Sequence, residues 1–192
     1  PSLPVCLVRH ERNQGLSGAL RSGFHAALKH AADDDAIITM DADDTHHPGQ
    51  APRMVALLEE GYDIVIASRY QPGARIVGVP RVRRLLSDGM SLLFRFAYPI
   101  PGARDYSSGF RAYRAAVLRH AFAHYGEAFI SERGFTCMVD VLIKLARLGA
   151  VITEIPMVLR YDRKPGKSKM NVPRTVAQTL WLLVRRRLGH LD

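Results

Sequence analysis

Two carboxylates separated by a single residue, Asp41 and Asp43, are the strongest chemical signal in the sequence. They follow residues 36–40 (AIITM), an apolar run that predicts a buried strand. Because side chains alternate along an extended backbone, both carboxylates should point the same way. Such a pair suits Mg²⁺ or Mn²⁺, which prefer oxygen ligands and keep positions open for phosphates. His46 and His47 raise zinc as a second possibility, which is weaker because no further His or Cys has zinc-ligand spacing. The simplest alternative is an acidic turn that binds no ligand.

Charge is unevenly distributed along the chain. The sequence has 27 Lys and Arg against 18 Asp and Glu, a formal net charge of +9. Residues 33–63 hold nine acids and one base, whereas residues 160–192 hold nine bases and two acids. A cation site beside a phosphate site would give this pattern, although solvated surface is the alternative for either run. A nucleic-acid-binding domain more often spreads its bases over one face between aromatic residues, so nucleic acid is the least favoured partner.

Length and composition limit the class of protein. A chain of 192 residues, 47% hydrophobic and 23% charged, is typical of one globular domain with its own core. Two cysteines in apolar stretches, Cys6 and Cys137, argue against a disulfide scaffold and favour a reducing compartment. The longest uncharged stretch near the end, residues 175–184, is half of the roughly 20 residues that span a bilayer. We therefore expect no transmembrane helix.

The spacing of apolar residues predicts the elements that would position the acidic pair. Helical periodicity indicates amphipathic helices at about 17–30 (with Ser17 as N-cap), 48–60, 83–97, 138–146 and 172–184. Short apolar runs predict strands at 4–8, 36–40, 63–67 and 151–158. The alternation of strands and helices indicates an α/β fold with a mostly parallel sheet. In such folds ligands bind at the carboxyl ends of the strands, where the acidic pair lies.

Six segments resemble, in order, the motifs of the family 2 inverting glycosyltransferases with a GT-A fold. The similar segments are 12–16 (RNQGL), 41–48 (DADDTHHP), 68–70 (SRY), 83–87 (RRLLS), 105–111 (DYSSGFR) and 163–169 (RKPGKSK). The group that they resemble most closely is the dolichyl- and polyprenyl-phosphate mannose synthases with their glucosyl relatives. Six matches in order across nearly the whole chain are strong evidence, although each match alone is modest.

This resemblance implies transfer of a hexose, with mannose favoured, from GDP-mannose or UDP-glucose to a polyprenyl or dolichyl phosphate. The implied reaction inverts the anomeric configuration and depends on Mg²⁺ or Mn²⁺. A phosphate oxygen is already anionic at neutral pH, so the acceptor needs no strong base. Catalysis then depends on stabilising the departing nucleoside diphosphate. The alternative is a partial or inactive GT-A domain that serves as a binding or scaffold module.

The same resemblance assigns roles to single residues. The implied metal ligands are Asp41, Asp43 and Thr45, the last of which stands where some members have an amide. The implied catalytic residues are Asp43 and Asp105. The implied donor-binding residues are Asp41, Arg163, Ser168 and Lys169. The implied ligands of the acceptor phosphate are Arg69, Arg83 and Ser87, of which the arginines suit bidentate contact with phosphate.

The family pattern also suggests how the chain is divided. A βαβ unit that precedes the RNQGL motif in the family is missing, so we expect residues 1–170 to be an N-terminally truncated GT-A catalytic domain. Residues 171–192 should form an amphipathic basic helix, which either lies in a membrane interface or packs on the sheet. We expect a cytoplasmic protein, peripheral at the cytosolic face of a membrane, with a membrane-anchoring protein as a further partner.

Overall fold

A computed structural model describes residues 4–132, 134, 136–163 and 181, without the side chains of Arg81 and Arg83. Its α-helices are α1 (Gly15–Leu28), α2 (Ala51–Glu59), α3 (Arg81–Ala97), α4 (Ala115–Tyr125) and α5 (Thr136–Arg147). Its strands are β1 (Ala36–Thr39), β2 (Ile64–Ser68), β3 (Arg75–Val77), β4 (Arg111–Arg114), β5 (Ile152–Pro156) and β6 (Val158–Arg160). Short 3-10 helices are η1 (Pro48–Gln50), η2 (Gly126–Ile130) and η3 (Tyr161–Arg163).

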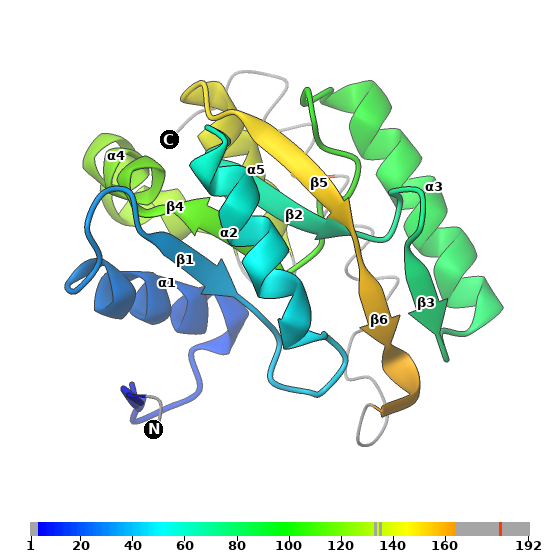
Figure 1. The fold of residues 1–192 in the computed structure, drawn as a ribbon, viewed down its shortest axis with the longest axis horizontal. Helices are drawn as coiled ribbons and strands as arrows, with labels where there is room; N and C mark the ends of the chain where they lie inside the picture. Colours follow the sequence, from blue (N-terminus) through cyan, green and yellow to red (C-terminus); the bar gives the residue numbers. More distant parts are fainter. Residues whose placement is uncertain (1–3, 133, 135, 164–180, 182–192) are drawn as a thin grey trace.

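The centre of the molecule is a four-stranded sheet with the order β1–β4–β2–β5 (Figure 1). β2 pairs with β5 in parallel, whereas β4 runs antiparallel to both β1 and β2. The predicted α/β class is confirmed, and β1, β2 and β5 share one direction, but the sheet is mixed. Periodicity misses β4 because its sequence (RAYR) places an arginine at each end and forms no apolar run.

A second, two-stranded sheet continues from one end of the first. The strand predicted at 151–158 divides into β5 and β6, and β6 pairs in parallel with β3. Met157 makes the transition, because its N–H donates to the Ser68 carbonyl at 2.9 Å and its carbonyl accepts from the Arg75 N–H at 2.8 Å. β6 then approaches the loop after β1, where the Arg160 N–H donates to the Thr45 carbonyl at 2.8 Å. The basic segment after β6 thereby starts beside the predicted metal site.

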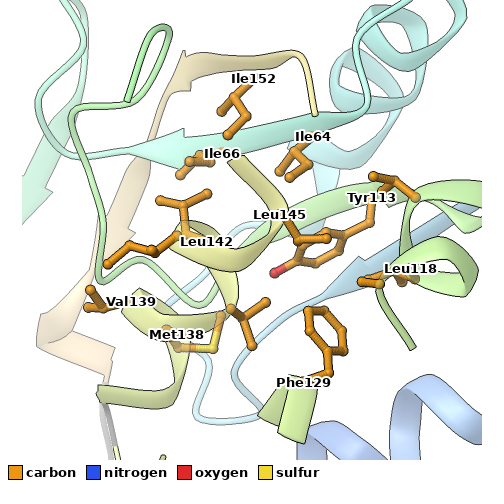
Figure 2. Close-up of a cluster of buried hydrophobic side chains, with 14 of the residues drawn as sticks. Ile64, Ile66, Tyr113, Leu118, Phe129, Met138, Val139, Leu142, Leu145 and Ile152 are labelled. Atoms are coloured by element: carbon orange, nitrogen blue, oxygen red, sulfur yellow. The ribbon is translucent and has the colours of Figure 1, made fainter. Parts of the chain in front are cut away.

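Helices cover both faces of the main sheet, and β2 contributes to both cores. Every residue of β2 is buried, as expected of a strand covered on each face. Ile64 and Ile66 belong to the larger core with α1, α4 and α5, where Ile66 lies close to Leu142 and Ile64 to Leu145 (Figure 2). Val65 and Ala67 belong to the smaller core beneath α2. α3 lies apart from these helices, along the side of the molecule where β3 is found (Figure 1).

The helices predicted within the described residues are present, with ends that differ from the predicted ones by a few residues. α1 begins at Gly15 rather than at Ser17, and Gln14 is its N-cap. The Asn13 side chain accepts the Gly15 N–H at 2.8 Å, so the turn that starts the helix lies before the serine. α4 was not predicted. Most of the helix expected at 172–184 lies outside the described residues, as do Ser168 and Lys169.

The strand predicted at 4–8 is wrong. Residues 4–10 have no strand conformation, and the side chains of Val5 and Leu7 are 89% and 85% exposed. An apolar run becomes a strand only when a neighbour supplies hydrogen-bond partners, and no described strand pairs with this segment. Across the part of the chain that the structure describes, no helix is both long and apolar enough to cross a membrane.

Candidate active site

The loop after β1 carries the two carboxylates predicted to bind metal. The Asp41 N–H donates to Nδ1 of His46 at 3.2 Å, and the buried His46 ring stacks on Phe110 with 5.2 Å between the ring centroids. The Asp43 carboxylate accepts the Thr45 hydroxyl at 2.6 Å and the Thr45 N–H at 3.3 Å. Thr45 and His46 are both buried, so the exposed acidic loop is fixed from beneath by two polar side chains.

Gly109 of the DYSSGFR segment lies against the acidic loop. Its carbonyl accepts the Thr39 hydroxyl at 2.8 Å, which ties it to the end of β1. A Cβ atom at Gly109 would lie only 3.2 Å from Oδ1 of Asp41. Glycine therefore leaves the space that this carboxylate occupies, and the structure brings two of the six motifs together.

The donor set at this loop fits a divalent cation. The oxygens of Asp41 and Asp43 are hard ligands that Mg²⁺ and Mn²⁺ prefer. Within the described residues, no three His, Cys, Asp or Glu side chains gather to form a complete protein cage. Two carboxylates with open positions are typical of an ion that is completed by substrate phosphates and water.

Arg69 and Asp105 form a bidentate ion pair at the end of β2. One carboxylate oxygen, Oδ2, accepts from Nε at 2.8 Å and from the Arg69 N–H at 3.0 Å, and the other, Oδ1, accepts from Nη2 at 2.7 Å. Nη2 also donates to the Ser107 hydroxyl at 2.7 Å. Among the described residues, Nη1 of Arg69 has no hydrogen-bond partner. The guanidinium is therefore fixed along one edge and available along the other.

Electrostatics keep this pair charged. Burial raises the pKa of Asp105, but the charge of Arg69 and its hydrogen bonds lower it by more, so the net change is downward. Burial likewise lowers the pKa of Arg69, and attraction to Asp105 reverses this, so the pKa is raised overall. Arg69 is therefore cationic whenever the carboxylate is ionised. A fixed cation with free N–H groups is suited to binding a phosphate.

Helix α3 is attached to the same cluster. The Tyr70 hydroxyl donates to the Ser87 carbonyl at 3.0 Å, and the Arg69 guanidinium lies 5.5 Å from the centre of the Tyr70 ring. Burial raises the pKa of Tyr70 to about 12, so its hydroxyl remains a donor at neutral pH. The Ser91 hydroxyl donates to the Arg104 carbonyl at 2.8 Å. Tyr70 thereby connects Arg69 with the backbone of Ser87, whose role at an acceptor phosphate stays a prediction.

Other predicted residues are only partly placed. Arg83 lies on α3, one turn before Ser87, but its side chain is outside the described part. Nη1 of Arg163 is 4.0 Å from Asp44 Oδ2, and both side chains are exposed. This contact brings the start of the basic loop to the acidic loop. Arg111, the last residue of DYSSGFR, is fully buried and donates to the carbonyls of Met138 and Tyr106, so it supports the loop from within.

Sequence reasoning missed the residues that hold the predicted ones in place. His46 lies inside a quoted motif, but a motif does not say that its ring supports the Asp41 backbone. Glu154 of β5 accepts the backbone N–H groups of Arg104 and Asp105 and was not singled out. A single carboxylate within an otherwise uncharged strand (ITEIP) was the available signal.

The fold is that of the GT-A glycosyltransferases. Two crystal structures of glucosyl-3-phosphoglycerate synthase from Mycobacterium tuberculosis, one with phosphoglyceric acid and one with Mn²⁺ and UDP-glucose, align with TM-scores of 0.55 and 0.54. Each covers 95% of this chain at 18% identity, and the alignments cover 58% and 57% of those chains. The family profile named Glycosyl transferase family 2 matches residues 2–122. The chain belongs to this family of glycosyltransferases, as its motifs predicted.

Several curated relatives are similar over most of the chain. The undecaprenyl-phosphate mannosyltransferase of Micrococcus luteus is 33% identical over 96% of this chain. The dolichol-phosphate mannosyltransferase of Pyrococcus furiosus and the polyprenol monophosphomannose synthase of Mycolicibacterium smegmatis are 32% and 29% identical over 87% of it. The chain spans 76%, 44% and 60% of the lengths of these three relatives, respectively.

Proposed function

We propose that this chain transfers a hexose, with mannose as the first choice, from a nucleotide sugar to a polyprenyl phosphate with inversion. The names of its relatives support the acceptor and the sugar. The observation that carries the proposal is the position of the segment 105–109. At one end Asp105 holds Arg69, and at the other Gly109 lies against Asp41. The arginine that would bind the acceptor phosphate and the carboxylate pair that would bind the cation thus border one segment.

The proposed chemistry requires little acid–base catalysis. An oxygen of the acceptor phosphate attacks the anomeric carbon, and the bond from that carbon to the nucleoside diphosphate breaks, with the electron pair leaving on the diphosphate. The nucleophile is already anionic, so orientation and charge stabilisation determine the rate. Arg69 would hold the acceptor phosphate through its open edge, together with Arg83 and Ser87. GDP-mannose and UDP-glucose are both candidate donors.

The acidic loop would hold a divalent cation, Mg²⁺ or Mn²⁺, through Asp41 and Asp43. Bound there, the cation supplies positive charge next to the donor diphosphate. Thr45 was predicted as a third ligand. Its buried hydroxyl donates to Asp43, which supports an orienting role for Thr45 within the same site. Asp105 was predicted as catalytic, and its four hydrogen bonds from Arg69 and Ser108 support a role in fixing the arginine.

Peripheral contact with a membrane is part of the proposal, and α3 is the described element that supports it. The apolar residues on its outer side are exposed to between 44% and 84%: Val82, Leu85, Leu86, Leu92 and Phe96. Their spacing follows the helical repeat, so they form an apolar stripe along one side of the helix, with Gly89 between Leu86 and Leu92. An amphipathic helix of this kind can lie in the interface of a bilayer. Because α3 also carries Ser87, the stripe would place the acceptor site next to the lipid that supplies the acceptor.

The test is transfer of radiolabelled sugar into a lipid-extractable product. The chain is incubated with undecaprenyl phosphate, Mn²⁺ and either GDP-mannose or UDP-glucose. We expect Asp43→Asn to lower the rate about a hundredfold, as for loss of a group that stabilises developing charge. The control is Asp34→Asn, since Asp34 has a side chain that is 95% exposed. Absence of transfer from both donors would reject the proposal, and binding of undecaprenyl phosphate without transfer would support the alternative of a binding module.

A further inference from the structure

Glu154 of β5 is a buried carboxylate to which the proposed chemistry assigns no role. Its side chain extends toward the irregular segment between α3 and β4. Oε1 accepts the backbone N–H of Arg104 at 2.6 Å and that of Asp105 at 2.7 Å. Oε2 lies 3.4 Å from Nε2 of Gln71, in the segment that follows Arg69. One side chain therefore contacts both segments that form the Arg69–Asp105 pair.

The segment before Asp105 depends on this strand for its position. Residues 99–110 have no helix or strand of their own, so their backbone groups need partners in local turns or on other elements. Gly102 has a φ of +81°, and a Cβ atom there would lie 1.8 Å from the Ile152 carbonyl oxygen. The segment therefore lies directly on β5. Glu154 supplies the acceptor that orients the next two N–H groups.

We propose that Glu154 is a positioning residue for the acceptor-phosphate site. By fixing the Asp105 backbone, it sets the Asp105 carboxylate, and through it the Arg69 guanidinium, in the orientation that binds phosphate. The inference rests on the proposed function, because it assumes that Arg69 contacts the acceptor. Glu154 lies outside the six motifs, and we expect it to affect the affinity for the polyprenyl phosphate but not the affinity for the nucleotide sugar.

This role requires a hydrogen-bond acceptor at the right distance from the two N–H groups, and it does not require a negative charge. Glu154 is only 9% exposed, and burial raises its pKa, although the hydrogen bonds from the two backbone N–H groups act in the opposite direction. A glutamine has the same length and retains an Oε1 that can accept both N–H groups. An aspartate keeps the charge but is one methylene too short to reach them. The three substitutions Glu154→Ala, Glu154→Gln and Glu154→Asp therefore separate length from charge.

The first test is steady-state kinetics of the full chain with undecaprenyl phosphate and GDP-mannose. We expect Glu154→Ala and Glu154→Asp to raise the KM for undecaprenyl phosphate about tenfold, with the KM for GDP-mannose unchanged within about twofold. Glu154→Gln should stay within about threefold of the wild type for both substrates. Glu127→Ala is the matched control, since that glutamate is 77% exposed. An equal rise in both KM values, or a Gln variant as weak as the Ala variant, would overturn the inference.

The second test does not depend on activity. An arginine held in a bidentate ion pair protects its Nε proton from exchange with water, so Arg69 should give an observable Nε–H signal by NMR, assigned by its loss in Arg69→Lys. We expect this signal to disappear in Glu154→Ala and Glu154→Asp and to persist in Glu154→Gln and Glu127→Ala. Its persistence in all four variants would overturn the positioning role. If the wild type transfers no sugar, the proposed function fails, and this signal still decides whether Glu154 orients Arg69.

Discussion

Gly109 is the residue at which the segment 105–109 meets the acidic loop after β1. Its missing side chain leaves room for Oδ1 of Asp41, and its φ is not in the left-handed region that would require glycine. The need for glycine here is therefore one of space. Filling this space would displace a carboxylate that is proposed to bind a cation, so we expect a larger effect on activity than on stability.

Gly109→Ala should consequently lower activity while leaving the fold intact. The added Cβ meets the end of a flexible, exposed side chain, so the free energy of unfolding should change by less than about 1 kcal/mol. Displacement of the Asp41 carboxylate should lower kcat/KM at least about tenfold. Sugar transfer and urea unfolding measure the two effects.

The control for this variant is Gly23→Ala in α1, where a Cβ atom would meet nothing within 4 Å. Alanine in the interior of a helix should raise the unfolding free energy by about 0.5–1 kcal/mol without affecting transfer. Full activity of Gly109→Ala would mean that Asp41 does not need the space that glycine provides.

At the level of residues, the motifs predicted which side chains matter but not which partners they contact. Arg69 and Asp105 were assigned to different roles from the sequence, and the structure joins them in one ion pair. Their pairing depends on β2 and the segment 105–109 meeting in space, which no local pattern encodes. Glu154 was missed for the same reason, because its partners are distant backbone N–H groups.

At the level of elements, local periodicity located every described α-helix except α4, and it was insufficient for strand pairing. α2, α3 and α5 are present where apolar spacing predicted them. β4 and the β3–β6 pair could not be predicted, because a strand of three or four residues is defined by its partner rather than by its own sequence. Periodicity identified only part of the covered face of α3, because Phe94 is buried as its pattern predicted and other members of the pattern are not. Leu85, a member of the predicted apolar pattern, is 73% exposed.

The exposed stripe of α3 leads to a prediction about membranes. Replacing Leu85 and Phe96, which are 73% and 84% exposed, with glutamine removes apolar area from the stripe without changing its charge. Each apolar side chain buried in lipid contributes about 1.5–3 kcal/mol, so the double variant should bind vesicles at least about tenfold more weakly. Co-sedimentation with phosphatidylglycerol vesicles measures this change.

The matched variant for the vesicle experiment is Val151→Gln, which changes an exposed valine just before β5, outside α3. It should bind vesicles as the wild type does. Equal binding by all three proteins would exclude α3 as the membrane contact. Transfer to a water-soluble, short-chain polyprenyl phosphate should be affected less than transfer to the long-chain lipid in vesicles.

At the level of the whole molecule, the buried Arg69–Asp105 pair links the end of β2 to the segment between α3 and β4, and the stability of the fold should reflect its charge. Removing one partner of a fully buried ion pair typically costs about 3–5 kcal/mol. The Arg69 side chain is 21% exposed and can be partly solvated, so Asp105→Asn should lower the unfolding free energy at pH 7 by about 2 kcal/mol. Urea unfolding followed by circular dichroism measures this difference.

The pH dependence of that difference tests its electrostatic origin. The pKa of Asp105 is lower in the folded protein than in the unfolded chain, so its contribution is complete above the unfolded value of about 3.9 and is lost as the pH falls through the folded value. The difference in unfolding free energy between wild type and Asp105→Asn should therefore be constant from pH 7 to about 5 and become smaller below about pH 4. Glu154, whose pKa is raised, changes stability in the opposite sense, but it is present in both proteins and largely cancels in the comparison. Asp34→Asn changes an exposed ion pair, so its unfolding free energy should be close to that of the wild type at every pH. A difference that persists unchanged at pH 3 would mean that the shape of the Asp105 side chain, rather than its charge, stabilises the site.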